Sequence, residues 1–182
     1  MILIINGSPN KESKTMSVVK ELLQQSNEKQ IVINSYQQTI ISCDDCKYCD
    51  HQIGCSKSDD MDHIHELLEQ ATTLIIASPI YFGGLSDQTM KIINRFQRYY
   101  SQKWVLKDLN IPQFDNLILV STQGSDKLRM FNGAIETMNI LDKLFTPKYT
   151  NNIMIPESDS TPLLTPIQLE QIKETYKKMI QN

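Results

Sequence analysis

The chain opens with M-I-L-I-I-N-G-S-P-N-K-E-S-K-T (residues 1–15), and this stretch decides the fold. Residues 2–5 are an unbroken apolar run that ends at Asn6-Gly7, which is typical of a strand buried on both faces. Small and hydroxyl-bearing residues follow, and apolar residues then recur at helical spacing from Val18. A buried strand, a small-residue loop and a helix in this order predict the first unit of an α/β fold.

The same alternation continues along the chain. Further short strands are predicted at residues 31–33, 73–77, 117–120 and 153–155, and helices near 61–71, 86–99, 130–141 and 166–179. The last helix begins with Thr165-Pro166-Ile167-Gln168, a capping box with proline at the first helical position. Five apolar strands alternating with amphipathic helices predict a parallel sheet covered on both faces. No repeat or linker is evident, so residues 1–182 are expected to form a single domain.

Composition narrows the class of protein. The 182 residues are 40% hydrophobic and 21% charged, with a net charge of −3, which is ordinary for a globular protein. The chain has no cluster of lysine and arginine residues, so nucleic acid is not an expected partner. No apolar run approaches the ~18 residues of a membrane span, so no membrane partner is expected either. The first strand lacks a preceding basic segment, so we expect no signal peptide and a cytoplasmic location.

The loop after the first strand has the features of a phosphate site. Free backbone N–H groups and the positive end of the helix dipole would face a ligand there, and Ser8, Ser13 and Thr15 add hydroxyl donors. The glycines of a Walker loop or a dinucleotide fingerprint are missing. A hydroxyl-rich loop suits the phosphate of flavin mononucleotide (FMN). The alternative is a plain strand-to-helix turn rich in capping residues.

Two later loops would lie at the same sheet edge, because ligands of open α/β sheets bind beyond the carboxyl ends of the strands. Residues 78–84 read Ser-Pro-Ile-Tyr-Phe-Gly-Gly, a stiff aromatic loop that could pack on a flat ring, or simply cap the core. Residues 121–126 read Ser-Thr-Gln-Gly-Ser-Asp, whose polar groups could bond a ring edge or cap the next helix.

Together these loops resemble those of the flavodoxin-like NADPH-dependent FMN reductases and the related iron–sulfur flavoproteins. The matching pieces are Gly7-Ser8-Pro9 with Thr15, the 78–84 loop, Asp59-Asp60-Met61, and Lys91 with Arg95. They extend over most of the chain, from Met1 to about Ile155. The resemblance implies a doubly wound five-stranded parallel sheet in the order 2-1-3-4-5. It also implies FMN at the carboxyl edge of the strands, and a homodimer or homotetramer.

Residue-by-residue matching to this family implies a flavin site made by all three loops. The family often carries arginine where Asn10 stands, and Lys14 would supply the missing positive charge. The first loop would hold the phosphate, the second would flank the isoalloxazine ring, and the third would meet the ring from the other side. The implied residues are Ser8, Asn10, Ser13, Lys14 and Thr15; Pro79, Ile80, Tyr81, Phe82 and Gly83; and Thr122, Gln123, Gly124 and Ser125.

All four cysteines lie in an insertion at about residues 42–58: Cys43, Cys46, Cys49 and Cys55. Clustered thiols in a cytosolic chain suggest a metal site or redox chemistry more than structural disulfides. The resemblance implies a [4Fe–4S] cluster; zinc and a metal-free thiol loop remain alternatives. The neighbouring Asp44, Asp45 and Asp50 disfavour further negative charge, and Lys47 and Lys57 offset them in part. His51 is expected to be solvated, and His63 and His65 to lie on the surface.

The function expected from these features is an FMN-dependent oxidoreductase. It would accept hydride from NAD(P)H and reduce a quinone, a flavin or another small acceptor, and the cofactor would carry the chemistry. An FMN and iron–sulfur electron carrier is the first alternative, although such carriers are usually more acidic. A cysteine-based sensor or binding module without flavin is the second.

Overall fold

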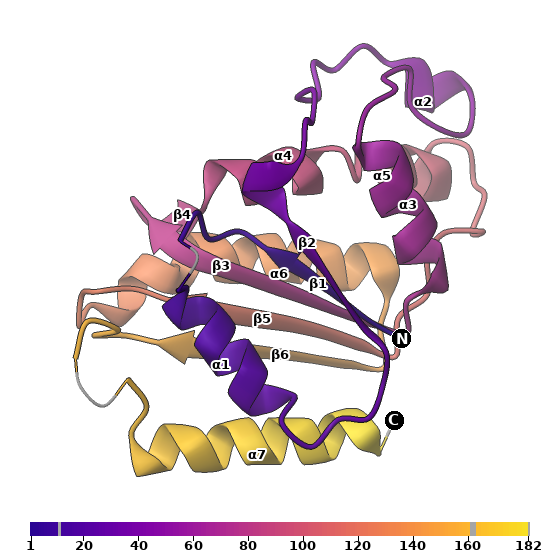
Figure 1. Ribbon diagram of the computed structural model, residues 1–182. Coiled ribbons are helices and arrows are strands. Elements are labelled where there is room, and N and C mark those ends of the chain that lie inside the picture. The colour runs from indigo at the N-terminus through magenta and orange to yellow at the C-terminus, as the bar shows by residue number, and fades with distance from the viewer. Residues whose placement is uncertain (11, 161–162, 182) are drawn as a thin grey trace.

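The computed structural model describes residues 1–10, 12–160 and 163–181, and its centre is a parallel sheet (Figure 1). The sheet order is β2-β1-β3-β5-β6, with the short β4 pairing antiparallel to β3. Numbering only the five long strands in chain order gives 2-1-3-4-5, so the predicted flavodoxin-like order is confirmed. The strands are β1 (Ile2–Asn6), β2 (Gln30–Asn34), β3 (Thr73–Tyr81), β4 (Gly84–Leu85), β5 (Asn116–Thr122) and β6 (Tyr149–Ile155).

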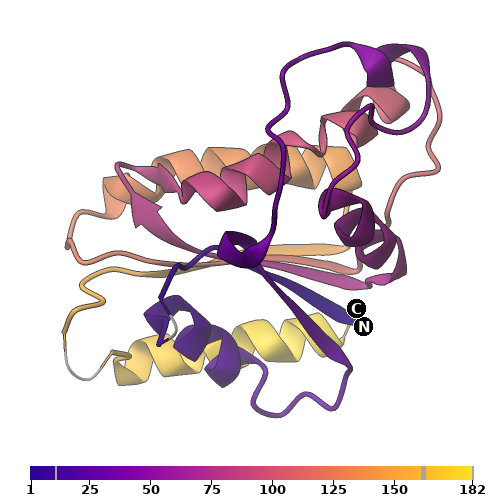
Figure 2. The same ribbon diagram turned by 45° about the horizontal axis from the view of Figure 1, so that its top comes forward.

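Helices cover both faces of the sheet, as Figure 2 shows. One face carries α1 (Lys14–Leu22) and α7 (Pro166–Ile180), and α7 begins with the predicted capping box. The other face carries α3 (Met61–Gln70), α4 (Asp87–Asn94), α5 (Gln97–Trp104) and α6 (Asn132–Phe145). The short helix α2 (Tyr48–His51) stands apart from the sheet, within the cysteine segment (Figure 1).

Alternation along the buried strands creates two cores. In β1, Ile2 and Ile4 pack toward Val18 and Leu22 of α1, whereas the neighbouring Leu3 and Ile5 belong to the core beneath α3 to α6. Every residue of β1, and every residue of β5, is buried. Burial on both faces explains why these strands read as continuous apolar runs.

Besides shifts in the ends of elements, such as β6 beginning at Tyr149 instead of residue 153, three details differ from the sequence prediction. Strand β3 continues past Ala77 to Tyr81, because Ser78 and Pro79 keep pairing with β5 at Ser121 and Thr122. The helix predicted at 86–99 is two helices, α4 and α5, because tight turns at Arg95 and Phe96 bury both side chains.

The third difference concerns the histidines. His63 and His65 are two residues apart on α3, and such a spacing sends their side chains to different sides of a helix. His63 is exposed as predicted, but the surface location predicted for His65 is wrong. Its ring is buried and its Nδ1 lies 2.9 Å from the Tyr99 hydroxyl of α5.

Candidate functional site

A pocket of about 270 Å³ lies at the carboxyl edge of the sheet, where the loops after β1, β3, β5 and β6 meet. We call it the loop pocket. Parallel strands end at one edge, so residues far apart in sequence converge there. Its described lining is Ser8, Asn10, Glu12, Ser13, Lys14, Thr15, Pro79, Ile80, Tyr81, Thr122, Gln123, Gly124, Ser158 and Asp159.

The first loop is shaped by its own polar side chains. Asn6 Oδ1 accepts from the backbone N–H of Ser8 at 3.1 Å, and Ser8 Oγ accepts from that of Asn10 at 3.3 Å. Ser13 is the N-cap of α1, and its side chain accepts from the N–H of Met16 at 3.2 Å. The first turn of α1 therefore opens into the pocket with its remaining N–H groups directed at any ligand.

Close packing fixes the start of this loop. A Cβ on Gly7 would lie 1.8 Å from Thr89 Oγ1 and 2.9 Å from Ser86 Oγ, both at the start of α4. Glycine is therefore the residue that lets the loop approach α4 so closely. On the other side, the buried hydroxyls of Thr15 and Thr122 lie 2.6 Å apart and tie the first loop to the third.

The second loop is a tight hairpin. Tyr81 pairs with Gly84, so Phe82 and Gly83 form a two-residue turn, and both have positive φ, at 51° and 83°. Pro79, Ile80 and Tyr81 line the loop pocket, whereas Phe82 and Gly83 are not among its lining residues. Phe82 stands fully in solvent, at 107% relative exposure.

The third loop contributes Thr122, Gln123 and Gly124 to the pocket, and Ser125 is not among the lining residues. Sequence reasoning missed three lining residues: Glu12, Ser158 and Asp159. The last two follow β6, and the rule that parallel strands end at one edge could have indicated their loop. Two backbone hydrogen bonds hold that loop to the third one, from Ser158 N–H to Gln123 C=O (2.8 Å) and from Glu157 N–H to Ser125 C=O (3.1 Å).

The four cysteines line one recess of about 20 Å³, here called the cysteine recess. Four cationic residues line it too: Lys47, Lys57, Arg95 and Arg98. Cys46 Sγ lies 3.2 Å from Ser56 Oγ, and this hydrogen bond is the main cause that holds the pKa of the Cys46 thiol below its usual value. Cys49 Sγ lies 3.5 Å from Ser101 Oγ. Across the described residues, no three His, Cys, Asp or Glu side chains are arranged to hold a metal ion.

The acidic residues among the cysteines all have partners. Asp44 accepts from Lys57 and Asp45 from Lys47, each at 2.7 Å, and Asp50 accepts from the Ser101 hydroxyl. The Lys57 hydrogen bond lowers the pKa of Asp44. These carboxylates are thus paired with lysines or hydrogen-bonded, and Arg95 and Arg98 also line the recess. Negatively charged cysteine thiolates are therefore less unfavourable here than the acidic residues of the sequence suggested.

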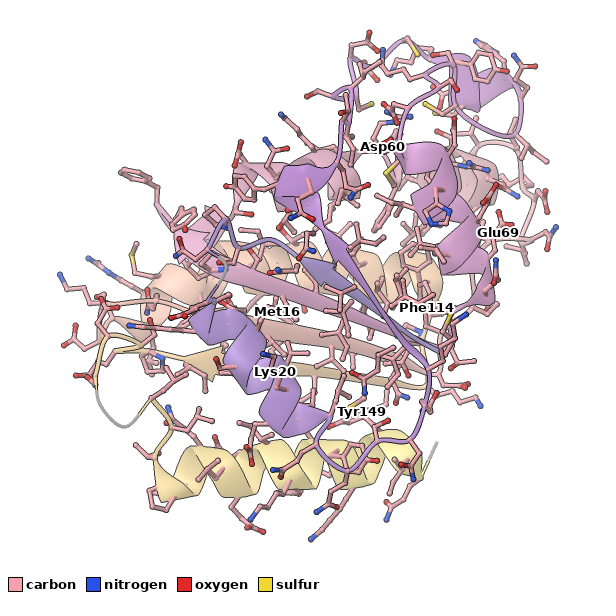
Figure 3. The ribbon with its side chains drawn as sticks, viewed as in Figure 1. Met16, Lys20, Asp60, Glu69, Phe114 and Tyr149 are labelled. Atoms are coloured by element: carbon pink, nitrogen blue, oxygen red, sulfur yellow. The ribbon has the colours of Figure 1, made fainter. Side chains whose placement is uncertain are left out.

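The loop pocket and the cysteine recess lie apart in the chain. Figure 3 shows Met16 of α1 beside the first loop, and Asp60 at the start of α3 beneath the cysteine segment. The loop pocket and the cysteine recess share no lining residue among those described. No described helix is both long and apolar enough to cross a membrane.

The fold and the loop pocket define a flavodoxin-like α/β protein with a pocket at the carboxyl edge of its sheet. The family profile of NADPH-dependent FMN reductases matches residues 1–145, and the chain belongs to this family.

Curated relatives include iron–sulfur flavoproteins. One from Methanocaldococcus jannaschii is 32% identical over 97 residues, which cover 52% of this chain and 50% of the relative. Another, from Methanosarcina thermophila, is 26% identical over 107 residues, covering 57% and 56%. The chain thus spans about half the length of the curated relatives it matches.

Solved structures share the fold. An NAD(P)H:quinone oxidoreductase from Methanothermobacter marburgensis superposes with a TM-score of 0.72 at 14% identity, covering 98% of this chain and 94% of that one. An azoreductase from Bacillus anthracis gives 0.72 at 10% identity, with 100% and 99% covered. At such identities the likeness concerns the fold alone.

Proposed function

We propose that this protein is an FMN-dependent oxidoreductase that takes hydride from NAD(P)H and reduces a small acceptor such as a quinone or a free flavin. The observation that carries the proposal is the loop pocket, whose lining includes eleven of the fourteen flavin-site residues implied by the family resemblance. Family membership supports the same cofactor. When bound, FMN supplies the redox chemistry, so the chain needs no acid–base pair of its own.

The residues present fit a flavin phosphate and ring. Ser8, Asn10, Ser13 and Lys14 would hold the phosphate beside the N-terminus of α1. Thr15 would act mainly through Thr122, since their buried hydroxyls bond each other. Pro79, Ile80 and Tyr81 would exclude water from one side of the ring, and Thr122, Gln123 and Gly124 would orient it from the other. Phe82 and Gly83 lie outside the pocket lining and would face the solvent-exposed side of the ring. Ser125 would support the third loop through its backbone hydrogen bond with Glu157.

A second candidate function is FMN and iron–sulfur electron transfer. The specific observation that favours it is the common recess of Cys43, Cys46, Cys49 and Cys55, with cationic side chains around it. Four thiolates are the usual ligands of a [4Fe–4S] cluster. The names of the curated relatives point the same way. Assembly as a homodimer or homotetramer stays a prediction.

The test begins with protein purified without oxygen and assayed for flavin, iron and zinc. We expect the purified protein to contain FMN or to bind it on titration. Stopped-flow mixing with NADH or NADPH should bleach the flavin absorption bands at a rate no slower than steady-state turnover. A flavin that binds but is not reduced by either nucleotide would favour the carrier. A chain that rejects FMN would contradict the proposal and favour a cysteine-based sensor. Iron near four atoms per chain, as a cubane cluster requires, would support the second candidate.

A further inference from the structure

Two acidic residues, Glu12 and Asp159, line the loop pocket, although an acidic residue is out of place in a site for an anion. Asp159 lines the pocket, and Lys14 is the one cationic side chain among the described lining residues. The two are paired, because Lys14 Nζ donates to Asp159 Oδ1 at 2.6 Å. The positive charge of Lys14 is thus neutralised by a residue that lies 145 positions further along the chain.

The Asp159 side chain is 80% exposed, but the backbone before it is fixed next to the pocket. Backbone hydrogen bonds fix the preceding residues, Glu157 and Ser158, to the third loop, and Ser158 is buried. The Asp159 side chain lies above Gly124, since a Cβ on Gly124 would be 2.6 Å from Asp159 Oδ2. Asp159 therefore sits between the third loop and the start of α1, where the phosphate of the proposed ligand would bind.

From this arrangement we infer that Asp159 is a specificity-determining residue, which competes with the phosphate of FMN for Lys14. The inference rests on the proposed function. A phosphate dianion that enters the first loop must either draw Lys14 away from Asp159 or share it, and in both cases it gains less than from a free lysine. Riboflavin has no phosphate and does not meet this competition. Asp159 lowers the preference of the site for the phosphorylated flavin and eases the release of FMN.

The experiment compares FMN and riboflavin affinities by fluorescence titration for the wild type and Asp159→Asn. We expect Asp159→Asn to bind FMN about two- to fivefold more tightly, the range expected for one exposed ion pair. Riboflavin affinity should stay the same, and the FMN gain should shrink at high salt because exposed charges are screened. The matched control is Glu157→Gln, which removes one negative charge from the same loop at a residue outside the pocket lining.

Lys14→Met, alone and combined with Asp159→Asn, separates competition from simple repulsion. If Asp159 acts through Lys14, the gain from Asp159→Asn should be larger with Lys14 present than without it. An equal gain in both backgrounds, an unchanged FMN affinity, or a loss of affinity in Asp159→Asn would overturn the inference while flavin binding, and so the proposed function, still stood. Failure of the wild type to bind either flavin would instead overturn the proposed function, and this inference with it.

Discussion

Phe82 is held in a backbone conformation that its residue type disfavours. Its φ of 51° lies in the left-handed region, which costs an L-residue about 1 kcal/mol or more, and its fully exposed ring gains no packing in return. Two-residue hairpin turns with positive φ at both positions prefer Asn-Gly, and this turn is Phe82-Gly83. Strained residues of this kind gather at functional sites, so we expect Phe82 to contact the nicotinamide or the acceptor at the mouth of the pocket.

The variant Phe82→Asn tests this role. Restoring the favoured turn should raise the unfolding temperature by about 2 °C, as expected for ~0.5–1 kcal/mol in a chain of this size. Loss of the aromatic contact should lower kcat/KM about three- to tenfold, the worth of one aromatic contact. Thermal unfolding and steady-state kinetics measure the two effects. Phe82→Leu, which keeps the strain, is the control for stability. Unchanged kinetics in Phe82→Asn would show that the ring has no role in turnover.

At the scale of elements, the cysteine segment is fastened at its base by one buried ion pair. Arg95 follows α4, and its guanidinium donates to the C=O of Ile41 (2.9 Å), to the C=O of Lys57 (3.2 Å) and to Asp59 Oδ2 (2.7 Å). Arg95 and Asp59 are 1% and 4% exposed. Ile41 directly precedes the insertion and Lys57 lies near its end, so Arg95 closes it into a loop whose two ends share one side chain.

Removing this side chain should loosen the insertion without disturbing the sheet. We expect Arg95→Met to lower the free energy of unfolding by about 3 kcal/mol, because Asp59 would be left buried without its charged partner. Amide hydrogen exchange in residues 42–58 should accelerate more than in β1 or β5. Lys47→Met is the matched control, since the Lys47 and Asp45 pair of the same segment is exposed and should matter little. Urea unfolding measures the free energy of unfolding of both variants. Equal losses of this free energy in Arg95→Met and Lys47→Met would contradict the proposed role of Arg95.

The same elements show what sequence reasoning can and cannot find. The five long strands were predictable because short apolar runs alternate with amphipathic helices, whereas their order was implied by the family resemblance. The first and third loops were predictable from hydroxyls at strand ends. The break between α4 and α5 was not, since Arg95 lies at the break and bonds residues 36 to 54 positions away, which no local pattern reveals. Asp159 was missed for the same reason, because its role depends on contacts with Lys14 and Gly124.

At the scale of the whole molecule, His65 links stability to pH. Burial lowers its pKa to about 3, and repulsion from Arg98 and Arg95 adds to this, against a smaller opposing effect of Asp59. The unfolded chain binds a proton at this histidine below pH ~6.5, whereas the folded protein does not until pH ~3. The unfolded state therefore binds more protons in this window, and stability falls as the pH falls from about 6.5 toward 3.

This linkage predicts a loss of about 2 kcal/mol in the free energy of unfolding between pH 7 and pH 5, from ~1.4 kcal/mol per pH unit below 6.5. The window isolates His65 from Asp59. Burial alone would raise the pKa of Asp59, but hydrogen bonds from Ile41 N–H, Arg95 and Met61 N–H lower it below its usual value, so Asp59 affects stability only below about pH 4.

Urea unfolding at pH 7, 6 and 5 should show this slope in the wild type and a flat profile in His65→Gln. His63→Gln, at the exposed histidine of the same helix, should keep the slope. Parallel profiles for the wild type and His65→Gln would mean that the folded protein accommodates a proton on His65, and that the buried contact with Tyr99 opens in mild acid.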